Sequence, residues 1–225
     1  MKMDAAALVP AYNEAGTIAE VVRGVLPLVS RVLVVDDGST DGTGDEARAA
    51  GAEVIAHLTN RGKGHAVRTG LAHLLGGGIT HVVLLDGDMQ HLPQETTRLL
   101  DAAGATEAEV VIGERRFDPE QMPASRYYAN RIGSRALSWF VGIPIGDTQC
   151  GFRVFRADAL RRMTLSARGY EVETEMLVKL RRLGGRIISV PVTAVYNGQR
   201  SKLRPIRDTT RTCFLAVYYR FLQRV

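Results

Sequence analysis

The stretch His81-Val-Val-Leu-Leu-Asp-Gly-Asp-Met-Gln90 decides the fold class, because an apolar run leads directly into two carboxylates. A continuously apolar run of this length predicts a strand buried on both faces of a parallel sheet. Arg31–Asp37 and Ala5–Glu14 change from apolar to polar residues in the same way. The repetition predicts that three polar loops gather at the carboxyl edge of one sheet, where open α/β folds bind their ligands.

Helical segments separate these strands in the first half of the chain, and alternating strands and helices predict a doubly wound, mostly parallel sheet flanked by helices. The strands are expected at Ala5–Val9, Arg31–Val35, Val54–His57, Val82–Leu85 and Val110–Ile112. The helices are expected at Thr17–Leu28, Thr43–Ala50, His65–Leu75 and Gln94–Ala103.

The second half is less regular, and its expected elements end in an amphipathic C-terminal helix. They are a helix over Arg126–Val141, a strand over Gly151–Phe155, a helix over Glu173–Leu183, a strand pair around Ile187–Tyr196 and the tail 205–225. We expect one domain over 1–204, made of the regular half 1–114 and the less regular half 115–204, followed by the tail.

Composition and charge narrow the class of protein. A chain of 225 residues with 45% hydrophobic and 24% charged residues is typical of one globular domain. Residues 1–110 carry a balance of −7 and residues 111–225 one of +12, which together give the net +5. This asymmetry favours an anionic partner for the second half, such as phosphates or lipid head groups; a solvated basic surface is the alternative.

The chain contains neither a signal peptide at its start nor a run of about 20 apolar residues, the length that spans a bilayer. Cys150 and Cys213 lie far apart and lack metal-ligand spacing, which favours reduced thiols. We therefore expect a cytoplasmic protein that can rest on the cytoplasmic face of a membrane.

Asp86 and Asp88 are the candidate metal ligands, with the Gln90 carbonyl as a further oxygen. Two carboxylates one residue apart at a strand end suit Mg²⁺ or Mn²⁺, which would bridge to a diphosphate. Burying both without a cation would be costly. An ordinary acidic turn is the alternative, but the other polar strand ends weigh against it.

Asp37 ends the second strand, where its carboxylate can accept hydrogen bonds from a base or a ribose. The residues Ser39 to Asp41 alternatively cap the next helix, and both interpretations are compatible. Tyr12 can stack on a base, and Glu14 can hold the ribose or the base edge.

Asn60-Arg-Gly-Lys-Gly64 opens a helix, so its amides and Lys63 can meet phosphate; a capping turn with a solvated lysine is the alternative. The segment lacks the full P-loop pattern. No Gly-x-Gly-x-x-Gly follows the first strand, which counts against a nicotinamide or flavin enzyme.

Together these motifs resemble family 2 glycosyltransferases of the GT-A fold. Within that family the chain is similar to dolichyl-phosphate mannosyltransferases and bacterial polyprenyl-phosphate glycosyltransferases. The motifs are Val9-Pro-Ala-Tyr-Asn-Glu14, Val34-Val-Asp-Asp-Gly-Ser-Thr-Asp-Gly-Thr43, Asp86-Gly-Asp-Met-Gln-His91 and Gly151-Phe-Arg153. The resemblance runs from about residue 5 to about residue 210, and it implies an inverting, metal-dependent transfer from a nucleotide-sugar such as UDP-glucose or GDP-mannose. It also implies that 1–114 holds the nucleotide and that 115–204 holds the acceptor, the molecule that receives the sugar.

The resemblance also implies roles for single positions. Metal and donor diphosphate would be held by Asp86, Asp88 and Gln90. Candidate donor-binding residues are Pro10, Tyr12, Glu14, Val35, Asp37, Lys63, Gly87, Asp88, Arg115 and Lys202. Arg115, in Gly113-Glu-Arg115, matches an arginine that handles phosphate in this family. Tyr196 departs from the pattern, because the mannosyltransferases carry an arginine there; nearby Arg200 can substitute.

The acceptor is a polyprenyl phosphate or a small hydroxyl compound. A phosphate monoester is largely ionised at neutral pH and needs only cations to position it, whereas a hydroxyl group needs a general base. Candidate phosphate ligands are Arg126, Arg131, Arg153 and Arg200, and the candidate catalytic residues are Asp88, Arg115 and Asp147. Asp147 is the candidate base for a hydroxyl acceptor, whose enzymes follow this region with Gln-x-x-Arg-Trp. Here Val154 replaces the tryptophan, which favours the phosphate.

The same residues leave alternatives for the docking of the tail and for the class of protein. The basic, aromatic tail lies on an anionic membrane or packs on the domain itself. A nucleotide-sugar-binding module without turnover is an alternative to an enzyme, although the intact Asp86/Asp88 pair argues against it. A nucleotidyltransferase is disfavoured, because the first strand is not followed by a Gly-rich loop. No nucleic-acid reader motif is recognised.

Overall fold

A computed structural model describes residues 3–115, 138, 142, 146–148 and 150–195. Within them, seven strands form one sheet in the order β3-β2-β1-β4-β6-β5-β7. The strands are β1 (Ala5–Ala11), β2 (Arg31–Asp36), β3 (Glu53–Ala56), β4 (His81–Leu84), β5 (Val110–Arg115), β6 (Arg153–Arg156) and β7 (Ile187–Val192). The predicted doubly wound, mostly parallel α/β sheet is confirmed.

All neighbouring strands run parallel except where β6 is inserted, which pairs antiparallel with both β4 and β5. The insertion leaves β5 parallel to β4, so the carboxyl ends of β1, β2, β4 and β5 lie at one edge. Because β6 runs the other way, its first residue, Arg153, stands at that same edge, paired with Leu84 and Ile112. This edge holds the polar loops, and we call it the site edge.

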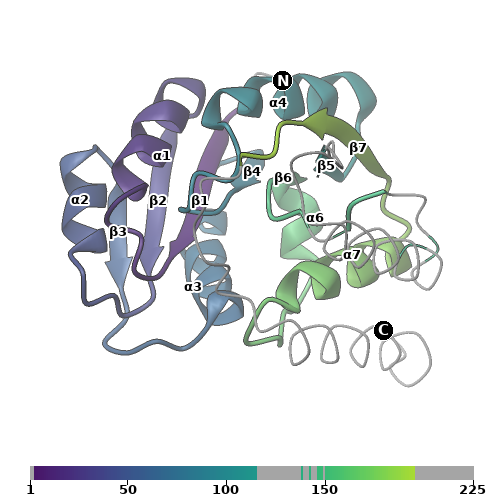
Figure 1. Cartoon of the computed structure of the whole chain (residues 1–225). Coiled ribbons are helices and arrows are strands. Elements are labelled where there is room, and N and C mark those ends of the chain that lie inside the picture. The colour runs from purple at the N-terminus through teal and green to yellow at the C-terminus, as the bar shows by residue number, and fades with distance from the viewer. Residues whose placement is uncertain (1–2, 116–137, 139–141, 143–145, 149, 196–225) are drawn as a thin grey trace, which may run out of the picture.

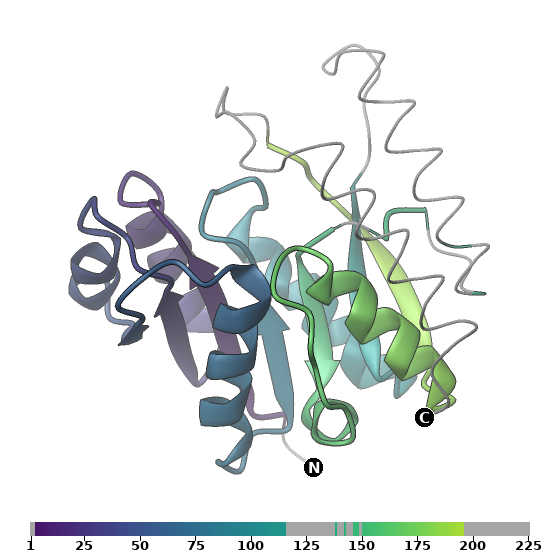
Figure 2. The same ribbon diagram turned by 90° about the horizontal axis from the view of Figure 1, so that it is seen from below.

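Helices cover both faces of the sheet (Figures 1 and 2). The helices α1 (Ile18–Val25), α2 (Thr43–Ala49) and α4 (Thr96–Thr106) lie on one face. The helices α3 (Lys63–Leu75), α6 (Ala157–Arg161) and α7 (Val172–Arg182) lie on the other. The central strands are buried between the two layers, as their apolar runs predict.

The expected helices of the first half are present, with small shifts at their ends. The segment predicted as Thr17–Leu28 divides into α1 and a 3₁₀ turn, η1 (Leu26–Leu28), because Pro27 lacks the amide hydrogen that an α-helix would need. A second 3₁₀ turn, η2 (Pro93–Glu95), precedes α4. Gly42 occupies the N-cap of α2, and the Asp41 carboxylate accepts the backbone amide of Thr43, the first residue of this helix, at 3.1 Å, so Asp41 contributes to the predicted cap.

The second half requires two corrections. The predicted strand pair around Ile187–Tyr196 is wrong, because the described part of that range, 187–195, holds one strand, β7, which pairs parallel with β5. The short helix α6 directly follows β6 and was not predicted. Of the predicted helix 126–141 only Ser138 is described, and it is helical; the tail 205–225 lies outside the described residues. In the described part of the chain, every helix is too short or too polar to cross a bilayer.

Candidate active site

Two loops of the first half are joined at the site edge. The amides of Asn13 and Glu14 donate to the hydroxyls of Ser39 and Thr43, at 2.9 and 2.8 Å. The Thr17 hydroxyl donates to the Gly87 carbonyl at 2.7 Å, which adds the loop after β4. The structure therefore brings the loops after β1, β2 and β4 together, as the sequence predicts.

The predicted donor-binding residues of β1 and β2 differ in accessibility. Pro10 and Val35 are buried in their strands, so they can shape the site only through their backbone and packing. Tyr12 is 38% exposed, and among the described residues it is an exposed large hydrophobic side chain. Its exposure suits the predicted stacking on a base, and that role stays a prediction.

Asp37 is buried and accepts several hydrogen bonds from one loop. His57 Nδ1 lies 2.6 Å from its Oδ1, and the amides of Arg61 and Gly62 donate to its carboxylate at 3.1 and 2.7 Å. A carboxylate that accepts this many hydrogen bonds orders the loop that precedes α3. In this structure Asp37 therefore anchors the segment that carries Lys63, while its predicted contact with the nucleotide stays untested.

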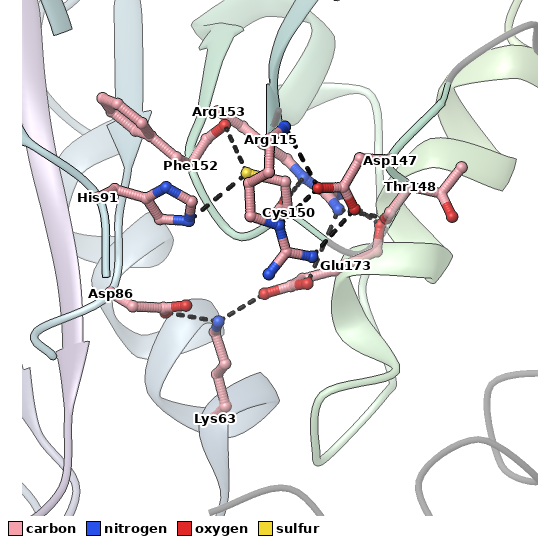
Figure 3. A network of polar contacts seen from close by, with 10 residues as sticks. All are labelled: Lys63, Asp86, His91, Arg115, Asp147, Thr148, Cys150, Phe152, Arg153 and Glu173. Atoms are coloured by element: carbon pink, nitrogen blue, oxygen red, sulfur yellow. Dashed lines mark hydrogen bonds and ion pairs between the residues drawn. The ribbon is translucent and has the colours of Figure 1, made fainter. Parts of the chain in front are cut away.

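Lys63 is not a solvated lysine, and that alternative is wrong. Its side chain is 9% exposed, and its Nζ lies 2.5 Å from both Asp86 Oδ1 and Glu173 Oε1 (Figure 3). The two carboxylates outweigh the effect of burial and raise the pKa of Lys63. The ammonium is thus charged and held between the two halves of the chain.

Asp86 and Asp88 titrate differently because their neighbours differ. Burial by itself would raise the pKa of Asp86, but the adjacent Lys63 ammonium lowers it below its usual value. Burial and the negative charge of Asp86 together raise the pKa of Asp88 to about 6. The Gln90 amide donates to Asp88 Oδ1 at 3.0 Å and orients that carboxylate. The two carboxylates lie close together at a strand end, and a bound cation would reduce the repulsion between their charges.

This donor set fits Mg²⁺ or Mn²⁺, which prefer hard oxygen ligands. In the described part of the chain, no group of three or more His, Cys, Asp or Glu residues forms a closed metal site. An ion at Asp86 and Asp88 therefore needs further oxygens, which the Gln90 carbonyl, water and a diphosphate can supply. Such an open coordination shell suits a metal that arrives with a nucleotide.

Arg115 and Asp147 form a two-point ion pair. Nε and Nη2 of Arg115 lie 2.5 and 3.0 Å from Oδ2 and Oδ1 of Asp147, whose side chain is 1% exposed. This fork geometry fixes the guanidinium and the carboxylate relative to each other. The predicted base is thus buried and already paired in this structure.

Arg153 does not bind an acceptor phosphate from where it lies, and we correct that expectation. It is 0% exposed and donates to the carbonyls of Cys150, Glu173 and Thr148 at 2.7, 2.7 and 2.8 Å. A buried guanidinium needs such partners, and three main-chain carbonyls supply them. Arg153 therefore shapes the loop that carries Asp147. The candidate ligands Arg126, Arg131, Arg200 and Lys202 lie outside the described residues.

Sequence reasoning assigned no place in the site to three residues that line this network (Figure 3). The sequence indicates Glu173 only as the start of a helix, where acidic residues are common, so no local pattern marks it as part of the site. His91 lies 3.5 Å from the Cys150 thiol, and burial lowers the pKa of His91 to about 4. Cys150 is a free, buried thiol, as its spacing from Cys213 suggests.

Comparison with known proteins places this geometry in a family. The model of glycosyl transferase family 2 matches residues 6–164. Glycosyltransferase AglJ of Haloferax volcanii is 37% identical over 219 residues, which cover 95% of this chain and 70% of that protein. An undecaprenyl-phosphate mannosyltransferase of Micrococcus luteus is 36% identical and covers 84% of this chain and 82% of its own length.

A solved structure shows the same architecture. Glucosyl-3-phosphoglycerate synthase from Mycobacterium tuberculosis, in complex with Mn²⁺, UDP and glucosyl-3-phosphoglycerate, has a TM-score of 0.76 and covers 97% of this chain and 80% of that one. At 24% identity the likeness establishes the fold. The chain therefore adopts the GT-A fold and belongs to glycosyl transferase family 2.

Proposed function

We propose that this chain transfers a sugar from a nucleotide-sugar to a polyprenyl phosphate, with a divalent cation at Asp86 and Asp88. The observation that carries the choice of acceptor is the Arg115–Asp147 pair, because it leaves the candidate base buried and paired. A hydroxyl acceptor would need that base to remove a proton. The likeness to an undecaprenyl-phosphate mannosyltransferase supports the same choice.

The proposed step is an in-line displacement at the anomeric carbon. An oxygen of the acceptor phosphate forms the new bond to that carbon. At the same time the bond from that carbon to the donor diphosphate breaks, and the electron pair of the broken bond leaves with the diphosphate. The acceptor oxygen is already ionised at neutral pH, so no proton has to be removed. A bound Mg²⁺ or Mn²⁺ would offset the charge on the departing diphosphate.

The side chains of this chain would position the two substrates. Asp37 orders the loop before α3, and Tyr12 offers an exposed ring for the base. Asp147 holds the Arg115 guanidinium in one orientation, which suits a group that meets phosphate. Asp147 would then act on the acceptor through Arg115 and not as a base.

Contact with a membrane is part of this proposal. A polyprenyl phosphate resides in a bilayer, and residues 111–225 carry a balance of +12. Basic residues near anionic lipid contribute about 1 kcal/mol each. We propose peripheral contact with the cytoplasmic face, which binding to anionic vesicles at low and high salt would test.

A transfer assay tests the acceptor directly. Purified protein would receive Mg²⁺ or Mn²⁺, radiolabelled UDP-glucose or GDP-mannose, and either a short polyprenyl phosphate or the matching polyprenol. We expect label in the organic phase only with the phosphate and with one of the two donors. Transfer to the polyprenol, or metal-dependent donor hydrolysis without a lipid product, would contradict the proposed acceptor.

A further inference from the structure

One ammonium group at the site edge serves two carboxylates from different halves of the chain. Lys63 begins α3, Asp86 follows β4, and Glu173 lies in the first turn of α7 (Figure 3). Nζ lies 2.5 Å from Asp86 Oδ1 and from Glu173 Oε1. The charge of Lys63 is therefore divided between Asp86, a proposed metal ligand, and Glu173, an acid outside the proposed ligand set.

The backbone around Lys63 keeps the ammonium in place. The Gly62 amide donates to Asp37, and the Gly64 amide donates to the Arg168 carbonyl at 2.9 Å. Gly62 has a φ of +93°, and a Cβ there would lie 2.5 Å from the same carbonyl, so the close approach requires glycine. Both flanks of Lys63 are therefore fixed. Removing one of its two carboxylate partners should change which carboxylate the ammonium pairs with, while the lysine stays in place.

Glu173 has a second cationic neighbour, but a weaker one. Arg153 Nη2 lies 3.7 Å from Glu173 Oε2, while the guanidinium donates to three main-chain carbonyls. The side chain of Glu173 is 9% exposed, so its charge is little screened by water. Lys63 is thus the close counter-ion of Glu173, and Glu173 competes with Asp86 for it.

We propose that Glu173 is a positioning residue of the metal site, which draws the Lys63 ammonium away from Asp86 and so sets the affinity for a divalent cation. The inference rests on the proposed metal site at Asp86 and Asp88. Without the charge on Glu173, the Lys63 ammonium would pair with Asp86 alone, and a dication would have to displace a tighter counter-ion from that carboxylate. Groups behind metal ligands commonly change metal affinity about 10–100-fold.

The experiment measures Mn²⁺ binding by the loss of the free-ion electron paramagnetic resonance signal, with Mn²⁺ alone as the probe. We expect Glu173→Gln to weaken Mn²⁺ binding about tenfold. Glu171→Gln removes a charge from the same end of α7 without touching Lys63, and it should change affinity less than about twofold. Equal weakening by both variants would overturn the proposal.

A double-mutant cycle separates action through Lys63 from direct action on the ion. Lys63→Met removes the competing cation and should tighten Mn²⁺ binding about threefold or more. In that background Glu173→Gln should have little effect, within about twofold. A tenfold loss that persists there would overturn the proposal, because Glu173 would then act on the ion itself. Lys63→Gln replaces Lys63→Met if the latter does not fold.

The outcome is independent of the acceptor, since no transfer is measured. Asp88→Ala sets the baseline, and Mn²⁺ binding that survives it would contradict the metal site and this inference together. If the Lys63 variant tightens Mn²⁺ binding and the Glu173 variant weakens it, the inference is supported even if the transfer assay with polyprenyl phosphate fails. Circular dichroism spectra of each variant establish that the fold is retained.

Discussion

Two ion pairs at the site edge, Lys63–Asp86 and Arg115–Asp147, are built differently. Lys63 reaches one oxygen of Asp86 and shares its charge with Glu173, and the Asp86 side chain is 30% exposed. Arg115 contacts both oxygens of Asp147, which is 1% exposed. A lysine ammonium is a compact point charge, whereas an arginine guanidinium is a planar fork.

We call the surroundings of Lys63, Asp86 and Asp88 the exchangeable region, and the surroundings of Arg115, Asp147 and Arg153 the fixed region. Asp86 has a counter-ion that a divalent cation can replace, and the crowded Asp88 beside it favours such a cation. Asp147 is locked to Arg115, and Arg153 supports the same loop from behind through the Thr148 carbonyl. The first region is therefore suited to binding and releasing a metal with a nucleotide, and the second to holding an arginine in one orientation.

The largest effect on stability is expected where the fixed region is supported. Arg153→Met leaves three buried carbonyls and Glu173 without their guanidinium, which should cost about 3–5 kcal/mol of the free energy of unfolding. Urea unfolding measures it. Arg162→Met, an arginine with a 48% exposed side chain, is the control and should cost less than about 1 kcal/mol. A loss as small as the control's would contradict the scaffold role.

Asp88→Ala removes a proposed metal ligand from the exchangeable region. We expect transfer to fall at least about 100-fold, equivalent to about 2.7 kcal/mol, because the diphosphate would leave without a held cation. The transfer assay and Mn²⁺ binding should fail together. Asp101→Ala, which removes an exposed acid from α4, is the control. Retained Mn²⁺ binding without transfer would mean that Asp88 acts in some other way than on the metal.

A smaller effect is expected from Asp147→Asn, which weakens the fixed pair. If Asp147 only orients Arg115, transfer should fall about tenfold, mainly through a higher KM for the acceptor, with an unchanged pH profile. If Asp147 is a general base, Asp147→Asn should lower transfer about 10²–10⁴-fold, and the pH–rate profile should lose the fall in rate at low pH. Asp158→Asn disrupts an exposed Asp–Arg pair and serves as the control. The larger loss would favour a hydroxyl acceptor.

The thiol of Cys150, beside the two pairs, gives a prediction about accessibility and not about transfer. Burial, with a further contribution from the charge of Asp147, raises the pKa of Cys150 to about 12, so the thiol stays protonated near neutral pH. In a Cys213→Ala background, a thiol reagent at pH 8 should label Cys150 at least about 100-fold more slowly than in denaturant. Rapid labelling of the native protein would show that this part of the site is more open than the structure indicates.

Much of the first half follows from the sequence. Each run such as Arg31–Val35 is apolar without alternation, so it had to be a strand covered on both faces, and its polar end had to reach the carboxyl edge. The positions of Asp37, Asp86 and Asp88 at one edge follow from that geometry. Local pattern sufficed there because parallel strands joined by helices allow few arrangements.

The second half depended on contacts that no local pattern shows. The antiparallel insertion of β6 between β4 and β5 put Arg153 inside the fold, and β7 pairs with β5 from 77 residues away, Val110 opposite Ile187. From the sequence, Lys63 is expected either to be solvated or to bind phosphate, and Arg153 is expected to bind phosphate. Both expectations assume exposed side chains, because most charged residues are exposed.

The sequence by itself thus determined the fold class, the strand ends and the residue types of the site. The tertiary structure alone decided which charges meet: Lys63 with Glu173, 110 residues apart, and Arg115 with Asp147, 32 residues apart. The physical reason is that a charge can be buried only where the fold supplies a partner, and these partners come from distant segments.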